Sequence, residues 1–263
     1  MKLGLGTWSL LDLDVYAAVK AIGDAGLEYV ELWGELPHAY PGWVDRRRLR
    51  DVLSAYDMAV STHAPFTDLN PAAPDPQVRR AVQKVLEGFV EFSAGLGATM
   101  VTVHPGSVHN ALLVEDAASS SVATIEKMVK AAGGVLSVNI ENQAKGTSRY
   151  HYPMGSSLKS LKGLLAGVEG AKCTLDTGHA YVSGLDPMSM SRRLGGRVAE
   201  VHLSDNWGKA DEHLVPGEGT ASLKELSKSL AKTDALVCLE INPHLYSRAN
   251  VMKGFETAKK MFF

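Results

Sequence analysis

The sequence lacks several features that would point directly to a function. It has only two cysteines in 263 residues, and its 27 lysines and arginines nearly balance its 29 aspartates and glutamates. So few cysteines exclude a disulfide scaffold and suit a reducing compartment. The sequence also has no run of about 18 apolar residues, which excludes a membrane-spanning helix. A net charge of −2 removes the general electrostatic argument for nucleic-acid binding. We therefore expect a soluble, cytoplasmic protein with no membrane partner.

Common catalytic motifs are missing too. The sequence contains no G-x-S-x-G, H-E-x-x-H or C-x-x-C motif, no G-x-G-x-x-G phosphate loop and no Walker lysine. Cys173 and Cys238 both lie within apolar runs, so we interpret them as small hydrophobic residues. The sequence thus gives no support for serine hydrolase, zincin or dinucleotide-binding chemistry.

The sequence does contain a repeated order of short apolar run, loop and helix. The apolar or β-branched runs predict strands that are buried on both faces. These strands are Lys2–Trp8, Tyr29–Trp33, Met58–His63, Met100–His104, Leu136–Glu141, Lys172–Asp176, Val198–His202 and Leu236–Glu240. The predicted helices are Asp12–Ala25, Trp43–Tyr56, Asp75–Gly97, Val114–Ala132, Ser156–Ala166, Pro187–Leu194, Ala221–Ala231 and Ser247–Phe262.

The helix Asp75–Gly97 is the clearest of these. Asp75 is an N-cap residue, Pro76 fits the first turn, and Gly97 can end the helix in the left-handed conformation. Its apolar stripe is expected at Val78, Val82, Val85 and Phe89.

Eight strand–helix pairs predict an α/β protein with a single (β/α)₈ TIM barrel. They occupy about 33 residues each in a chain of 263, which is typical of that fold. No linker, charge block or change in composition marks a boundary, so we expect one TIM-barrel domain over residues 1–263. An open doubly wound sheet is disfavoured because no glycine-rich phosphate loop follows the first strand.

Acidic residues and histidines recur where the predicted strands end. Six of the eight strands finish on such a residue: His63, His104, Glu141, Asp176, His202 and Glu240. The carboxyl ends of barrel strands form one rim, so we expect all six side chains to converge on the barrel axis. Alternation along the strands also places Cys238 and Leu236 inside the barrel below Glu240, and Glu200 below His202.

This convergence predicts a metal site. Several carboxylates around one axis repel one another unless a cation lies among them. Mixed histidine and carboxylate ligands suit Zn²⁺ or Mn²⁺, with Mg²⁺ and Co²⁺ as alternatives. His179, Asp211 and His213 follow two of the strands, and they either bind metal or substrate or support the other ligands.

The motifs at the strand ends resemble the xylose isomerase-like TIM barrel superfamily. That superfamily contains sugar and sugar-phosphate isomerases and epimerases, and also endonuclease IV. The resemblance covers about Val30 to Glu240 and rests on the order and spacing of these motifs. They are Thr62-His63-Ala64-Pro65-Phe66, Val103-His104-Pro105-Gly106, Ile140-Glu141-Asn142, Leu175-Asp176-Thr177-Gly178-His179, Val201-His202-Leu203-Ser204-Asp205-Asn206, Asp211-Glu212-His213-Leu214-Val215-Pro216-Gly217-Glu218-Gly219 and Leu239-Glu240-Ile241-Asn242.

In the epimerase branch, the resemblance implies one metal held by Glu141, Asp176, His202 and Glu240. Glu141 and Glu240 would also be the catalytic acid and base. The enzyme would be a divalent-metal-dependent isomerase or epimerase of a sugar, sugar phosphate or related polyol, with proton transfer through a metal-stabilised enediolate. Its partner would be a small carbohydrate, and the sequence leaves a homo-oligomer open.

In the endonuclease branch, the resemblance implies a multi-zinc phosphodiesterase acting on abasic DNA. Its additional ligands would be His63, His104, His179, Asp211 and His213, and nucleic acid is a partner only under this alternative. Trp33, Tyr40, Trp43 and Arg46-Arg47-Arg48 would then form an aromatic and basic patch, although such arginines more often lie on a solvated helix face. A barrel that binds a ligand without catalysis is the third alternative.

Overall fold

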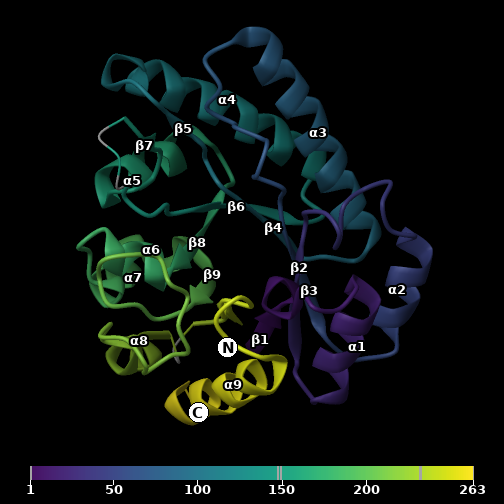
Figure 1. Cartoon of the computed structure of the whole chain (residues 1–263). Coiled ribbons are helices and arrows are strands. Elements are labelled where there is room, and N and C mark those ends of the chain that lie inside the picture. Colours follow the sequence, from purple (N-terminus) through teal and green to yellow (C-terminus); the bar gives the residue numbers. More distant parts are fainter. Residues whose placement is uncertain (1, 147, 149, 231–232, 263) are drawn as a thin grey trace.

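The computed structural model describes residues 2–146, 148, 150–230 and 233–262. Within these ranges, eight parallel strands close a barrel in the order β1-β10-β9-β8-β6-β4-β3-β2 (Figure 1). Their bounds are β1 Lys2–Gly6, β2 Tyr29–Trp33, β3 Ala59–His63, β4 Met100–Val103, β6 Ser137–Glu141, β8 Lys172–Asp176, β9 Val198–Leu203 and β10 Leu236–Leu239. The predicted TIM barrel is confirmed.

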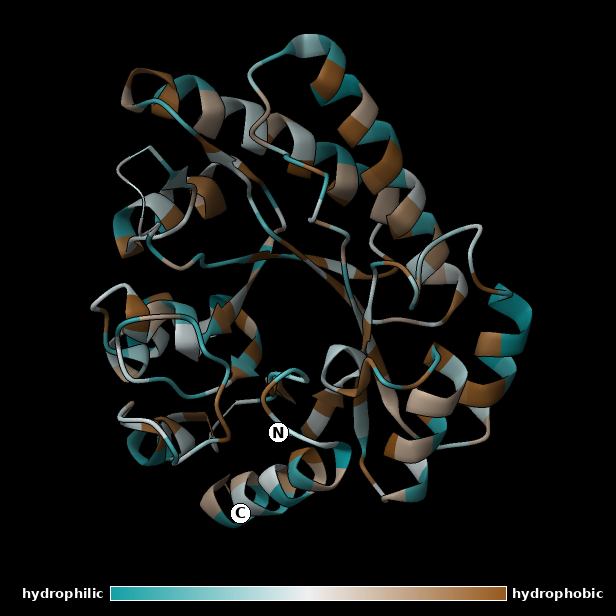
Figure 2. Ribbon diagram, in the orientation of Figure 1, coloured by the Kyte–Doolittle hydropathy of each residue, from teal (hydrophilic) through white to brown (hydrophobic). Residues whose placement is uncertain are grey.

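Helices lie around the outside of the barrel (Figure 1). They are α1 Val15–Asp24, α2 Arg46–Ser54, α3 Pro76–Gly95, α4 Val114–Ala132, α5 Leu158–Gly167, α6 Thr177–Val182, α7 Pro187–Leu194, α8 Leu223–Leu230 and α9 Arg248–Phe262. Hydrophilic and hydrophobic patches alternate along α3 and α9, as expected of helices with one face toward a core (Figure 2). Among the described helices, none is both long and apolar enough to cross a membrane.

Some predicted elements need correction. β1 ends at Gly6, and Thr7–Leu10 forms a 3₁₀ helix, so the predicted strand to Trp8 was two residues too long. Val78 was wrongly assigned to the buried stripe of α3, because its side chain is 52% exposed in the first turn. The sequence analysis also missed α6 and the two-stranded antiparallel ribbon of β5 (Ser107–Val108) and β7 (Tyr152–Pro153).

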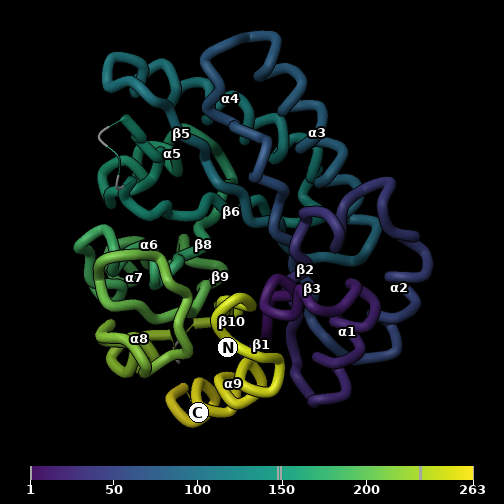
Figure 3. The backbone as a smooth tube through the Cα atoms, viewed as in Figure 1, coloured from purple at the N-terminus to yellow at the C-terminus, as the bar shows by residue number. Residues whose placement is uncertain are grey.

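The two ends of the described chain meet where the barrel closes. β1 pairs in parallel with β10, with Leu3 opposite Val237, and α9 runs beside β1 (Figure 3). Closure leaves the barrel sheet of the described residues without a free edge, so each of its eight strands has two neighbours and the strand ends are held in a fixed order. This order positions the residues at the carboxyl rim.

The barrel interior is layered. Tyr29, Met100, Leu236 and Cys238 form a small apolar cluster inside it, separate from the large core between strands and helices. Glu200 is fully buried and accepts hydrogen bonds from Tyr29, from Ser61 at 3.0 Å and from Thr102 at 2.6 Å. The alternation predicted for Leu236, Cys238 and Glu200 is therefore confirmed. Hydroxyl donors satisfy the carboxyl group of Glu200, which the sequence alone did not explain.

This network leads to a stability prediction. Glu200→Ala leaves buried hydroxyls without an acceptor and opens a cavity, so we expect it to lower the free energy of unfolding by about 3 kcal/mol or more. Urea denaturation measures the change. Glu169→Ala, at an exposed position, is the control and should stay within about 0.5 kcal/mol of the parent. A loss below about 1 kcal/mol for Glu200→Ala would show that the network adds little to stability.

Candidate functional site

The structure brings all of the predicted site residues to the carboxyl end of the barrel. His63, Glu141 and Asp176 are the last residues of β3, β6 and β8. His202 is the penultimate residue of β9, while His104 and Glu240 lie one residue beyond β4 and β10. His179 lies in α6, which begins directly after β8, and Asp211 and His213 lie in the loop that follows β9.

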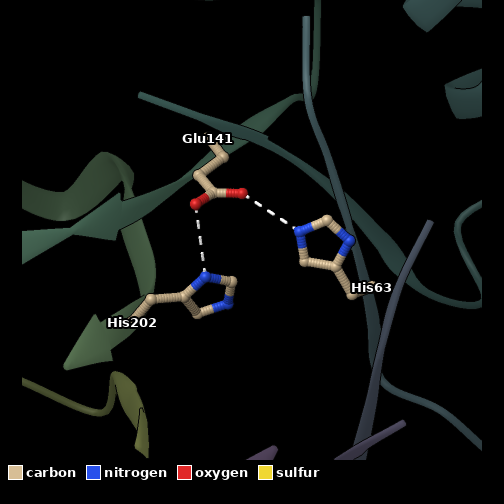
Figure 4. Close-up of side chains that lie close together, drawn as sticks. All are labelled: His63, Glu141 and His202. Carbon is tan, nitrogen blue, oxygen red and sulfur yellow. Dashed lines mark hydrogen bonds and ion pairs between the residues drawn. The ribbon is translucent and has the colours of Figure 1, made fainter. Parts of the chain in front are cut away.

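Glu141 is the centre of the cluster. Its side chain is 1% exposed, and its Oε2 atom lies 3.2 Å from Nε2 of His63 and 3.0 Å from Nε2 of His104. Its Oε1 atom lies 3.2 Å from Nδ1 of His179 and 3.3 Å from Nδ1 of His202. Figure 4 shows His63 and His202 on opposite sides of this carboxylate.

Backbone carbonyl groups orient several of the imidazoles. Nδ1 of His63 donates to the carbonyl of Ala64 at 2.9 Å, and Nδ1 of His213 lies 3.2 Å from the carbonyl of Glu240. Nδ1 of His179 donates to the carbonyl of Asn142 at 2.8 Å. A carbonyl oxygen only accepts, so each Nδ1 carries the proton. In a neutral ring each Nε2 would then carry a lone pair that could bind a metal ion, and here Nε2 of His63 faces Glu141 while Nε2 of His179 and of His213 face Asp211.

Two buried atoms support the metal interpretation. Within the described part of the chain, Oδ2 of Asp176 has no hydrogen-bond partner, and Nδ1 of His202 makes no hydrogen bond although it lies 3.3 Å from Oε1 of Glu141 and 3.4 Å from Oε2 of Glu240. Both residues are fully buried, and buried polar atoms without partners are rare in proteins. Ligand atoms of Asp176, His202 and Glu240 lie within 4.8 Å of one another, so one divalent ion could satisfy them together. This donor set fits the predicted metal.

The two glutamates have opposite pKa shifts. Burial alone would raise the pKa of Glu141, but the charges of His104 and His202 outweigh it and hold the pKa well below its usual range. Burial raises the pKa of Glu240 to about 7, against the charges of His202 and His213. Glu141 is therefore ionised at neutral pH, and Glu240 is close to its titration midpoint.

A second group lies beside Glu141. Nε2 of His179 is 3.0 Å and Nε2 of His213 is 3.1 Å from Oδ2 of Asp211. His213 has a φ of 49°, an uncommon conformation for a residue other than glycine, and it orients the ring toward Asp211 and Glu240. Ligand atoms of His179, Asp211 and His213 lie within 4.8 Å of one another. This group could hold an ion of its own.

A cavity of about 180 Å³ opens over Glu141 and Glu240. Trp8, Trp33 and Phe66 form its aromatic walls, whereas the fully buried Asp176 and His202 lie outside its lining. The sequence analysis did not assign these three aromatic residues to the cavity. Trp8 and Trp33 each end a predicted strand, so position at the rim could have identified both.

The sequence analysis also missed Glu31. This residue lies inside the barrel on β2, and its Oε2 atom is 3.2 Å from Nε2 of His202. The contact leaves Nδ1 of His202 facing the carboxylates of Glu141 and Glu240, at 3.3 Å and 3.4 Å. Glu31 lies in the middle of a strand, between Val30 and Leu32. A charged residue inside such an apolar run is unusual, and this feature of the sequence could have identified it.

The patch considered for nucleic acid is divided, because its Trp33 lines the cavity whereas its arginines do not. Arg46, Arg47 and Arg48 are exposed on α2, and the guanidinium of Arg48 lies 4.1 Å from the ring of Tyr16. In the described structure, none of these arginines lines the cavity over Glu141. The solvated helix face is the better interpretation of this run.

Comparison with known families agrees with this arrangement. A model described as a xylose isomerase-like TIM barrel matches residues 19–261. The chain belongs to this family. An uncharacterized protein of Mycobacterium tuberculosis is 29% identical, covering 95% of this chain and 92% of that protein. Fructoselysine 3-epimerase of Shigella flexneri is 22% identical, covering 94% of this chain and 95% of the relative.

Solved structures share the fold. A D-tagatose 3-epimerase-like protein has a TM-score of 0.86 at 23% identity, covering 99% of this chain and 97% of that protein. The IolI protein, whose crystal structure binds a zinc atom, has a TM-score of 0.82 at 17% identity, covering 99% of this chain and 96% of its own.

The contact between Glu31 and His202 can be tested through metal affinity. Glu31→Ala removes the group that holds Nε2 of His202, so we expect about 10- to 100-fold weaker binding of Zn²⁺ or Mn²⁺. Competition with a chromogenic chelator measures the affinity. Glu28→Ala, at an exposed position three residues earlier, is the matched control. Equal affinities for parent and Glu31→Ala would contradict this role.

Proposed function

We propose that this protein is a divalent-metal-dependent isomerase or epimerase of a sugar or related polyol. The observation that carries the proposal is the arrangement of the four residues Glu141, Asp176, His202 and Glu240. Two of them, Glu141 and Glu240, face the cavity, and the other two are buried and carry unpartnered atoms. The names of the fructoselysine and D-tagatose 3-epimerase relatives support the substrate class.

The four residues divide the chemistry between them. Asp176 and His202 would hold the ion together with Glu141 and Glu240. The zinc atom bound in the IolI structure supports the choice of a divalent ion. When bound, a divalent ion would polarise the substrate carbonyl and make the neighbouring C–H more acidic. Glu141 and Glu240 come from β6 and from the end of β10, well separated around the barrel. One would take the proton from carbon and the other would return it, either to the opposite face or to the neighbouring carbon.

The cavity suits a small, neutral substrate. Its volume of about 180 Å³ is below the range of about 300–1,000 Å³ that is typical of drug-sized ligands. The aromatic walls offer apolar surface to the C–H groups of a sugar, while carboxylates and imidazoles offer partners to its hydroxyls. Among the described lining residues there is no lysine or arginine. This composition favours an unphosphorylated carbohydrate over a sugar phosphate.

A multi-metal phosphodiesterase is the second candidate. The group His179, Asp211 and His213 favours it, as does the pair of imidazoles on Oε2 of Glu141. The absence of lysine and arginine from the described lining of the cavity opposes it, because proteins that bind duplex DNA gain most of their affinity from contacts with phosphate. We therefore place the isomerase first.

The role of Glu141 as a proton acceptor can be separated from its role as a metal ligand. Glu141→Gln keeps an oxygen for the metal but cannot accept a proton, so turnover should fall by several orders of magnitude while metal content changes less. The assay follows interconversion in a panel of free ketohexoses and ketopentoses. Glu126→Gln, exposed on α4, is the control. Full turnover by Glu141→Gln would show that Glu141 is not the base.

The number of metal ions distinguishes the two candidates. If His213 only contacts substrate or orients other ligands, His213→Ala should lower kcat/KM by about 10- to 100-fold and leave the metal content unchanged. Elemental analysis of parent and variant, with the exposed His244→Ala as control, gives the count. Loss of one ion per chain, together with cleavage of abasic duplex DNA by the parent, would favour the phosphodiesterase.

A further inference from the structure

A second cavity of about 460 Å³ adjoins the one over Glu141. Phe66, His104 and His179 line both cavities, so the two spaces share a wall. The rest of the second lining comes from the segments that follow β3, β4 and β6, which are neighbours in the barrel. The second cavity therefore extends the site toward one side of the mouth, away from Glu240.

The shared wall is a pair of stacked rings. Phe66 and His104 lie with ring centroids 4.3 Å apart and planes inclined by 28°. The backbone N–H of Phe66 donates to Oε1 of Glu35 at 2.6 Å, which holds the start of this loop in place. Phe66 is 36% exposed, so it forms a ridge at the mouth. A molecule bound over Glu141 could extend across this ridge.

The far wall is built by specific contacts. The side chain of Asn70 donates to the carbonyl of Ser107 at 2.8 Å and accepts from its N–H at 3.1 Å. Gly106 has a φ of 88°, and a Cβ there would lie 2.2 Å from Oδ1 of Asn70, so only glycine fits. Ser107 belongs to the ribbon of β5 and β7, which lies outside the barrel sheet. The ribbon thus forms one side of this cavity.

Asp68 is the one carboxylate among the described residues that line the second cavity. Asp68 is exposed and makes no ion pair with another described residue. Nε2 of Gln143 is buried and has no partner within the described chain. The described residues that line this cavity include no lysine or arginine. Phosphate would meet the carboxylate of Asp68 here, whereas an amine would find an acceptor in Asp68, and the carbonyl of an amide could accept from Nε2 of Gln143.

We propose that the second cavity is a subsite for the non-reacting part of an extended substrate. The substrate class is a sugar that carries an amine- or amide-bearing substituent, and Asp68 faces that substituent. This inference rests on the proposed function, because it takes the sugar itself to lie over Glu141.

The test uses probes that bind without reacting. A hexitol has no carbonyl group, so the metal-loaded protein can be titrated by calorimetry with a hexitol, its 1-(2-aminoethylamino)-1-deoxy derivative and its 1-phosphate. We expect the amine derivative to bind roughly three- to tenfold more tightly than the hexitol, and the phosphate to bind more weakly. Asp68→Asn should abolish the preference for the amine. Asp57→Asn, exposed at the opposite end of β3, should retain it.

The possible outcomes distinguish failure of the subsite from failure of the proposed isomerase function. Equal affinity for the amine derivative and the hexitol, or a preference that survives in Asp68→Asn, overturns the subsite. Turnover of free ketoses is measured separately in the parent. If ketoses are converted but the amine gives no advantage, the isomerase stands and the subsite fails. If no sugar is converted yet the amine preference depends on Asp68, the subsite stands and the proposed reaction fails.

Discussion

The carboxylate of Glu141 is shared by imidazoles from several strands and loops of the barrel. Among the described residues, His63, His104, His179 and His202 all approach one of its oxygens within 3.3 Å. With Nδ1 protonated, the Nε2 lone pair of a neutral His63 would point at a carboxylate oxygen, which is repulsive. Either imidazolium ions or bound cations must relieve this repulsion, and the same choice faces Asp211 with His179 and His213. Most of the chemistry we propose depends on that choice.

Burying so many ionisable side chains at the barrel mouth costs free energy, and hydrogen bonds in the layer of residues beneath them offset part of it. Glu200 and Glu31 lie under the cluster, where burial destabilises an ionised carboxylate. Hydroxyls from β3 and β4 satisfy Glu200, and His202 satisfies Glu31. His202 therefore links the two layers, with one ring nitrogen on Glu31 and the other facing Glu141 and Glu240. Parallel strands closed in register make this link possible, because alternate residues of β9 point to the same interior.

Much of this arrangement was accessible from the sequence. Buried parallel strands are nearly continuous apolar runs, so Glu141 and Asp176 stood out at the ends of such runs, and barrel topology then placed them together. Glu31 was missed because it interrupts an apolar strand in the middle, and its partner His202 is 171 residues away. The cavity walls were missed for a related reason. Trp8 belongs to a 3₁₀ helix, and Phe66 to a loop whose path depends on Glu35, a contact that no periodic pattern encodes.

The central claim is proton exchange at carbon between two glutamates of the barrel rim. Its most direct test is to incubate the metal-loaded protein with free ketohexoses in D₂O and follow the hydrogens next to the carbonyl by NMR. The account predicts that deuterium enters at one of these carbons in the parent protein. Interconversion should disappear in both Glu141→Gln and Glu240→Gln, because neither variant can relay the proton, and exchange should persist only for a sugar whose hydrogen faces the remaining glutamate. Equal interconversion in parent and variants, or conversion of a sugar with full retention of its original hydrogen, would contradict the account.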